Sequence, residues 1–170
     1  PFAELTMADV CLYFQVHQPF RLKKYSFFEI GKDSSYEDDV LNVDVLNRVS
    51  EKCYLPSTEL FLKLIEQTSG AFKCSLSLSG VLIEQLRRYR PDVLKRFQTL
   101  AQSGAVEFLS ETYYHSLSSV YSRPEFNRQV TKHKALIEEV FNQTPKVFRN
   151  TELIYSNKIA YQTEQLSFDG

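Results

Sequence analysis

The sequence has few glycines, no tryptophan and no net basic charge. Its five glycines form neither a GxGxxG pattern nor a phosphate-binding loop, which argues against a nucleotide-binding sheet. Lys and Arg number 20 against 21 Asp and Glu, so a nucleic-acid partner is not expected. No apolar run approaches the ~20 residues of a membrane span, and no charged segment followed by an apolar stretch marks a secretory signal. We therefore expect a cytoplasmic protein without a membrane partner.

Cysteine is also scarce. The three cysteines, Cys11, Cys53 and Cys74, include no CxxC pair, which argues against a disulfide framework and against a zinc site. Cys11 and Cys74 lie in strand-like runs, so we expect both to be buried thiols. We expect no bound metal and no cofactor.

The 170 residues, 43% of them hydrophobic, are enough for one core. Residues 1–8 are interpreted as an N-terminal extension or processing remnant, and residues 9–170 as a domain portion. The last segment, "QLSFDG", resembles the approach to another strand, which predicts that the natural chain continues.

Hydrophobic patterning predicts strands that alternate with helices. Strands are expected at 9–19, 71–80, 105–110 and 145–151, where β-branched and aromatic residues gather. Apolar residues at helical spacing, together with Pro and Gly at the ends, predict helices at 42–52, 56–70, 81–89, 91–104 and 124–141, and from near 155. This alternation predicts parallel pairing and an α/β fold.

Polar side chains follow the ends of the predicted strands. Functional groups of parallel α/β folds gather at the carboxyl ends of strands, so we expect one shared rim formed by His17, Gln18, Ser79, Glu111, His115, Arg149, Asn150 and Glu152.

Several of the ionisable residues on or near the strands also have a structural interpretation. His17 is a candidate structural histidine, Glu107 a surface carboxylate on a strand edge, and Glu111 a loop cap. For His133, on the apolar seam of a helix, we favour packing over catalysis. Glu152 suits a helix N-terminus, but a cap does not require Arg149 and Asn150 beside it. An arginine there favours the ionised form of a nearby carboxylate, as a nucleophile requires.

Three segments in order, "YFQVHQPFRL", "VEFLSETYYHSLSS" and "VFRNTELIY", resemble the first three motifs of glycoside hydrolase family 57, and most closely its α-amylase-like branch. The similarity extends from Asp9 to the end of the chain. It implies an incomplete seven-stranded TIM-type (β/α) barrel, of which residues 9–170 are the N-terminal portion. It also implies action on α-glucans with retention of configuration.

The resemblance implies a role for each motif. Glu152 would be the nucleophile, His17 would lie beside the sugar at the cleavage point, and Glu107 would reach the same pocket. Further candidates for substrate binding are Gln18, Glu111, His115, Arg149 and Asn150. The first motif departs from the family's frequent His-x-His-Gln-Pro, because Gln15 takes the first position. The family's general acid, an aspartate, would lie beyond residue 170, so the isolated 170-residue chain is expected to be inactive.

Aromatic residues gather in the long loop after the first strand, at Tyr25, Phe27, Phe28 and Tyr36. We expect them to line the glucan path, with packing over helices as the alternative.

Three other functions remain open. One is a 4-α-glucanotransferase on the same substrates, and another is an inactive glucan-binding homologue. The third is a metal-dependent deacetylase, which needs a carboxylate and two closely spaced histidines, whereas this chain offers only His17, His115 and His133.

Overall fold

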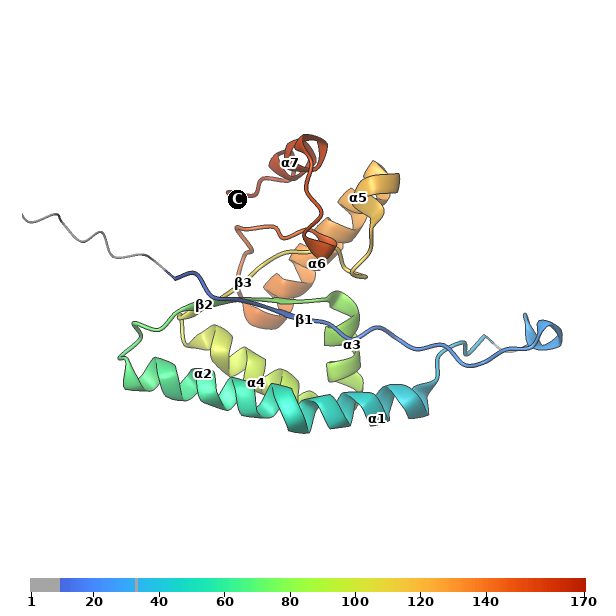
Figure 1. The fold of residues 1–170 in the computed structure, drawn as a ribbon, viewed down its shortest axis with the longest axis horizontal. Coiled ribbons are helices and arrows are strands. Elements are labelled where there is room, and N and C mark those ends of the chain that lie inside the picture. Colours follow the sequence, from blue (N-terminus) through green and yellow to red (C-terminus); the bar gives the residue numbers. More distant parts are fainter. Residues whose placement is uncertain (1–9, 33) are drawn as a thin grey trace, which may run out of the picture.

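The protein forms a parallel sheet whose strands alternate with helices (Figure 1). The computed structural model describes residues 10–32 and 34–170, and the predicted extension at 1–8 lies outside them. Three strands pair in the order β1-β2-β3: Tyr13–Val16, Cys74–Leu78 and Val106–Phe108. The α/β prediction is confirmed.

The predicted fourth strand is reduced to a single bridge, so the prediction of a regular strand at 145–151 is wrong. Phe148 forms a parallel bridge with Ser110, and the amide of Arg149 donates to the Ser110 carbonyl at 2.9 Å. The segment thus lies beside β3 in the fourth position. On its other side the Phe148 amide donates to the Gly170 carbonyl at 2.8 Å. The pairing with β3 ends there because the chain turns into a 3-10 helix, Thr151–Leu153.

The two helices predicted at 42–52 and 56–70 are one continuous rod. Helix α1 (Asp39–Val49) passes through a π-helical stretch, Ser50–Tyr54, into α2 (Leu55–Gln67). Pro56 lies at the first turn of α2 and has no amide hydrogen. The wider π turn before it, closed by the Leu55 amide on the Ser50 carbonyl, carries the helix past the proline.

The remaining helices follow the predicted order. They are α3 (Gly80–Tyr89), α4 (Pro91–Gln102), α5 (Ser118–Tyr121), α6 (Arg123–Phe141) and α7 (Asn157–Glu164). The four-residue α5 was not predicted, because one turn shows no periodicity. Among the described residues, every helix is too short or too polar to cross a membrane.

The two faces of the sheet differ in chemistry because successive side chains of a strand point to opposite sides. Leu76, Leu78 and Phe108 are buried against helices, and the Phe108 ring stacks on Phe141 at 4.0 Å between centroids. The opposite face, here called the polar face, carries Tyr13, Gln15, Ser75, Ser77 and Glu107, aligned by the register of the strands.

The thiol prediction is half right. Cys74 is buried in β2, whereas Cys11 is exposed. The regular pairing of β1 begins only at Tyr13, so Cys11 precedes the part of the strand that the sheet covers.

The loop between β1 and α1 extends away from the sheet (Figure 1). A bridge between Leu22 and Glu37 closes its base. Phe27 and Phe28 are 82% and 77% exposed, so these two rings do not cover helices of the described chain.

Candidate active site

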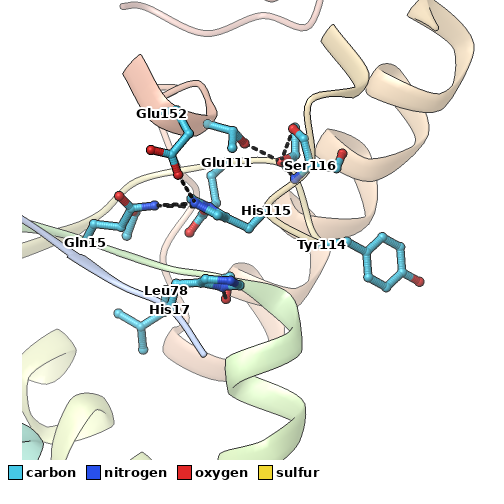
Figure 2. A network of polar contacts seen from close by, with 12 residues as sticks. Gln15, His17, Leu78, Glu111, Tyr114, His115, Ser116 and Glu152 are labelled. Atoms are coloured by element: carbon cyan, nitrogen blue, oxygen red, sulfur yellow. Dashed lines mark hydrogen bonds and ion pairs between the residues drawn. The ribbon is translucent and has the colours of Figure 1, made fainter. Parts of the chain in front are cut away.

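Four ionisable side chains meet at the carboxyl ends of the strands, and we call them the rim cluster: His17, Glu111, His115 and Glu152 (Figure 2). His17 follows β1, Glu111 and His115 follow β3, and Glu152 lies in the turn after the Phe148 bridge. We expected His17, Glu107 and Glu152 to share one cleft bordered by Arg149, and the structure places two of the three, His17 and Glu152, at the same end of the sheet.

His115 is the centre of the rim cluster. Its Nδ1 lies 2.9 Å from Oε2 of Glu111, and its Nε2 lies 3.2 Å from Oε1 of Glu152. The Glu111 side chain is fully buried, whereas the Glu152 side chain is 71% exposed. The hydrogen bond to Glu111, more than any other influence, raises the pKa of His115. The protonated ring has a donor for each carboxylate.

His17 lies against the same ring in the opposite electrostatic situation. The two imidazoles stack with centroids 4.2 Å apart, and His17 Nδ1 lies 2.7 Å from the Ser79 hydroxyl. Burial, followed by the neighbouring His115, lowers the pKa of His17. Stacked rings with pKa values displaced in opposite directions favour one charged and one neutral imidazole.

The backbone at two cluster positions is left-handed, with φ of 53° at His115 and 54° at Glu152. Such residues cost on the order of 1–3 kcal/mol each and persist where the surroundings fix them. The hydroxyls of Thr112 and Thr151, both buried, lie 2.9 Å apart and join the two loops that carry His115 and Glu152. Strained backbone gathers at functional sites.

A third histidine, His133, connects the rim cluster to the sheet and to α6. His133 of α6 is fully buried, its Nε2–H donates to the Leu78 carbonyl at 2.8 Å, and its Nδ1 accepts from the Glu111 amide at 3.3 Å. Burial lowers its pKa, in keeping with the neutral ring that this donor and acceptor pattern requires. The packing interpretation of His133 is confirmed, with a polar bridge that the sequence did not predict.

Two predicted rim residues hold loops in place. Gln18 accepts from Arg21 Nη2 at 2.9 Å through its side chain. Asn150 donates from Nδ2 to the Ser119 hydroxyl at 3.1 Å and to the Ile154 carbonyl at 2.9 Å. Asn150 therefore shapes the turn that presents Glu152.

Arg149 lies beside the polar face. Its guanidinium carbon is 5.3 Å from the centre of the Tyr13 ring, within the range of a cation–π contact. Its Nε and Nη1 are buried without a hydrogen-bond partner among the described residues. Arg149 therefore has two N–H donors available for a ligand, Nε and Nη1, next to β1, the strand that precedes His17.

Glu107 is on the polar face but outside the rim cluster. It aligns with Ser75 and precedes Glu111 by four residues, roughly 13 Å along an extended strand. It lines a cavity together with Cys11, Lys73 and Lys146, and no residue of the rim cluster lines that cavity. The structure therefore does not bring Glu107 to Glu152, as a single shared cleft would require.

Gln15 belongs to the site, although the sequence marked it only as a departure from a motif. Its Nε2 lies 3.1 Å from Nδ1 and 3.3 Å from Nε2 of His115. Alternation along β1 could have found it, because Gln15 shares a face with His17. The hydroxyl pair of Thr112 and Thr151 has no comparable signal in the sequence. In the part of the chain that the structure describes, no three His, Cys, Asp or Glu residues are placed to hold a metal.

A strand-end cluster of histidines and carboxylates on a parallel sheet is typical of barrel enzymes, and comparison with known proteins agrees. The model of glycosyl hydrolase family 57 matches residues 11–169. The chain therefore belongs to glycoside hydrolase family 57.

The chain is similar to longer proteins of this kind. A Methanocaldococcus jannaschii protein named "Putative alpha-amylase" is 42% identical over 161 residues, which cover 91% of this chain and 33% of the relative. "Alpha-amylase 1" of Dictyoglomus thermophilum is 26% identical over 126 residues, or 74% of this chain and 17% of the relative. The chain thus spans a third or less of these two relatives.

One solved structure supports the fold assignment. The 4-alpha-glucanotransferase of Thermococcus litoralis superposes with a TM-score of 0.66 at 16% identity, over 93% of this chain and 21% of that one. At this identity the likeness shows the fold alone. The chain therefore has the fold of part of a family 57 TIM-type barrel, as predicted.

Proposed function

We propose that the natural full-length protein is a retaining glycoside hydrolase of α-glucans, such as starch, glycogen or maltooligosaccharides, with Glu152 as its nucleophile. The observation that carries this proposal is the contact of His115 with Glu152, 3.2 Å from Nε2 to Oε1. It gives an exposed strand-end carboxylate a fixed donor on one oxygen and leaves the side chain 71% accessible.

The chemistry proceeds in two displacements. The Glu152 carboxylate attacks the anomeric carbon while a general acid protonates the departing glycosidic oxygen, and a covalent glycosyl-enzyme forms. Water then attacks the same carbon and releases Glu152, with the general acid now acting as base. His17 lies within reach of the sugar at the cleavage point, and Arg149 borders the path. We assign the acid to a residue that follows position 170 in the natural chain.

The same first displacement serves a 4-α-glucanotransferase if a sugar hydroxyl replaces water in the second. Phe27 and Phe28 have exposed rings that meet edge to face, with centroids 5.7 Å apart. They favour this second candidate, because an acceptor sugar needs a binding surface and sugar faces stack on aromatic rings. Alanine at either position would then raise KM for long substrates and shift the product ratio toward hydrolysis.

Replacement of the nucleophile tests the proposal. In the natural full-length protein, Glu152→Gln should lower turnover of maltooligosaccharides by several orders of magnitude with an unchanged fold. The matched control is Glu66→Gln on the exposed surface of α2, which should remain fully active. If Glu152→Gln keeps more than about a tenth of the activity, equivalent to less than ~1.4 kcal/mol of barrier, Glu152 is not the nucleophile.

Residues 1–170 alone should bind glucan poorly and show no turnover. General acid assistance contributes typically ~10²- to 10⁴-fold, and the isolated chain would lack it. Assays of the isolated chain on amylose and on an activated maltoside check this expectation. Measurable turnover of either substrate would contradict it.

A further inference from the structure

Glu111 is the least accessible member of the rim cluster, and the proposed two-step hydrolysis assigns it no role. Its side chain has no solvent exposure, so it does not reach a sugar as the structure stands. Its backbone amide is fixed by Nδ1 of His133 at 3.3 Å, and this histidine is itself anchored on the Leu78 carbonyl. The position of Glu111 is therefore set by the sheet and by α6.

Among the described residues, the Glu111 carboxylate has a single hydrogen-bond partner. Oε2 accepts from His115, and Oε1 is buried without a partner among the described residues. A buried carboxylate is costly unless it is paired. In the part of the chain that the structure describes, His115 provides the only direct contact that offsets this cost, so the two side chains form one electrostatic unit.

We propose that Glu111 is a positioning residue, which holds the ring of His115 so that Nε2–H is donated to the Glu152 carboxylate. The proposal rests on the proposed function, because it takes Glu152 to be the attacking group. In this arrangement Glu111 occupies Nδ1, which leaves Nε2 to face Glu152. The imidazole then carries a proton on each nitrogen, and its charge lies beside the nucleophile.

The charges around His115 are consistent with this role. The carboxylates of Glu111 and Glu152 face it from two loops, and His17 stacks on it from the third. The charge of Arg21 acts on His17 and lowers the pKa of His17. The side chain of Gln15 is neutral. Its Nε2 is the atom placed beside the ring, so a doubly protonated His115 requires the flipped amide orientation, with Oε1 as the acceptor. Within the described residues, His115 is therefore the ring that holds the positive charge.

Glu111→Gln tests the proposal in the natural full-length protein, because it keeps the shape and an acceptor but removes the charge. The raised pKa of His115 should fall, so the ring loses its proton at lower pH. The alkaline limb of the kcat/KM profile should move to lower pH in the same direction. We expect kcat to fall by roughly 10- to 100-fold, the range known for residues that orient metal-binding histidines, with KM changed by no more than about threefold.

The titration of His115 can be followed directly by NMR, with His115→Asn to assign its resonance. Glu66→Gln, on the exposed surface of α2, is the matched control, because it makes the same change of charge away from the rim cluster. It should leave both Tm and the His115 titration in place. If Glu111→Gln leaves that titration unmoved, or moves it without loss of kcat, the proposal is overturned.

Two further measurements, the His115 pKa of the unsubstituted protein and the activity of the Glu152→Gln protein, complete the test. If Glu111→Gln does not fold, the unsubstituted protein suffices: a His115 pKa at or below the usual 6.5 contradicts the proposal, and a higher value supports it. Failure of the proposed function would be seen separately, as an active Glu152→Gln protein.

Discussion

The two ends of the same three strands differ in how their polar groups are bound. At the carboxyl end, His17, Glu111, His115 and Glu152 are joined through one imidazole. At the amino end, Glu107 lines an open cavity with Lys73 and Lys146, and no hydrogen bond or ion pair of its side chain is seen among the described residues. Charged residues occur at both ends, but only one end fixes their geometry.

The difference follows from the loops. Strands β1 and β3 are followed by segments that are themselves anchored, through Ser79, through His133 and through the pair of Thr112 and Thr151. Catalysis needs groups held in one arrangement. The presence of a carboxylate on the polar face is therefore a weaker indicator of function than the contacts that hold it.

Of the substitutions that test this difference between the two ends, His133→Leu is expected to have the largest effect. The substitution leaves the Leu78 carbonyl and the Glu111 amide buried without their partner. Each such group costs about 1–3 kcal/mol, so we expect a loss of roughly 2–5 kcal/mol in the free energy of unfolding, measured by urea denaturation of the full-length protein. A loss below about 1 kcal/mol would show that His133 does not anchor the rim cluster.

A smaller effect is expected from Gln15→His, which restores the family's frequent first-motif residue and places a second ionisable ring beside His115. A protonated neighbour disfavours the charged form of His115, so its pKa should fall and the alkaline limb of kcat/KM should move to lower pH. The full pH profile of the variant measures this shift. A limb that moves to higher pH would mean that the new ring stays neutral and accepts a hydrogen bond from His115.

The smallest effect is expected from Glu107→Gln at the amino end. Because Glu107 lies roughly 13 Å along the strand from Glu111, its loss should lower kcat/KM by less than about tenfold, or ~1.4 kcal/mol. Steady-state kinetics beside Glu152→Gln would measure the contrast. Equal losses for the two variants would place Glu107 in the site after all, in agreement with the motif that the sequence suggests.

The sequence predicted the helices and strands more accurately than it predicted the side-chain contacts within the rim cluster. Amphipathic periodicity gave α6 at 124–141 against the observed Arg123–Phe141, because that pattern directly records which face is buried. Convergence of His17 and Glu152 followed from parallel strands alone. The central place of His115 could not be predicted, because it depends on a left-handed backbone that only a few per cent of non-glycine residues adopt. The joined rod of α1 and α2 was missed because Pro56 is read locally as a helix start.

Covalent trapping tests the central claim most directly. The full-length protein would be incubated with a fluorinated α-glucosyl fluoride, which forms the glycosyl-enzyme faster than it is hydrolysed, and then digested for peptide mass spectrometry. The account predicts one added fluorohexosyl group on Glu152, absent from the Glu152→Gln protein. Attachment to Glu111 or Glu107, or an enzyme that turns over its substrate without ever being labelled, would contradict it.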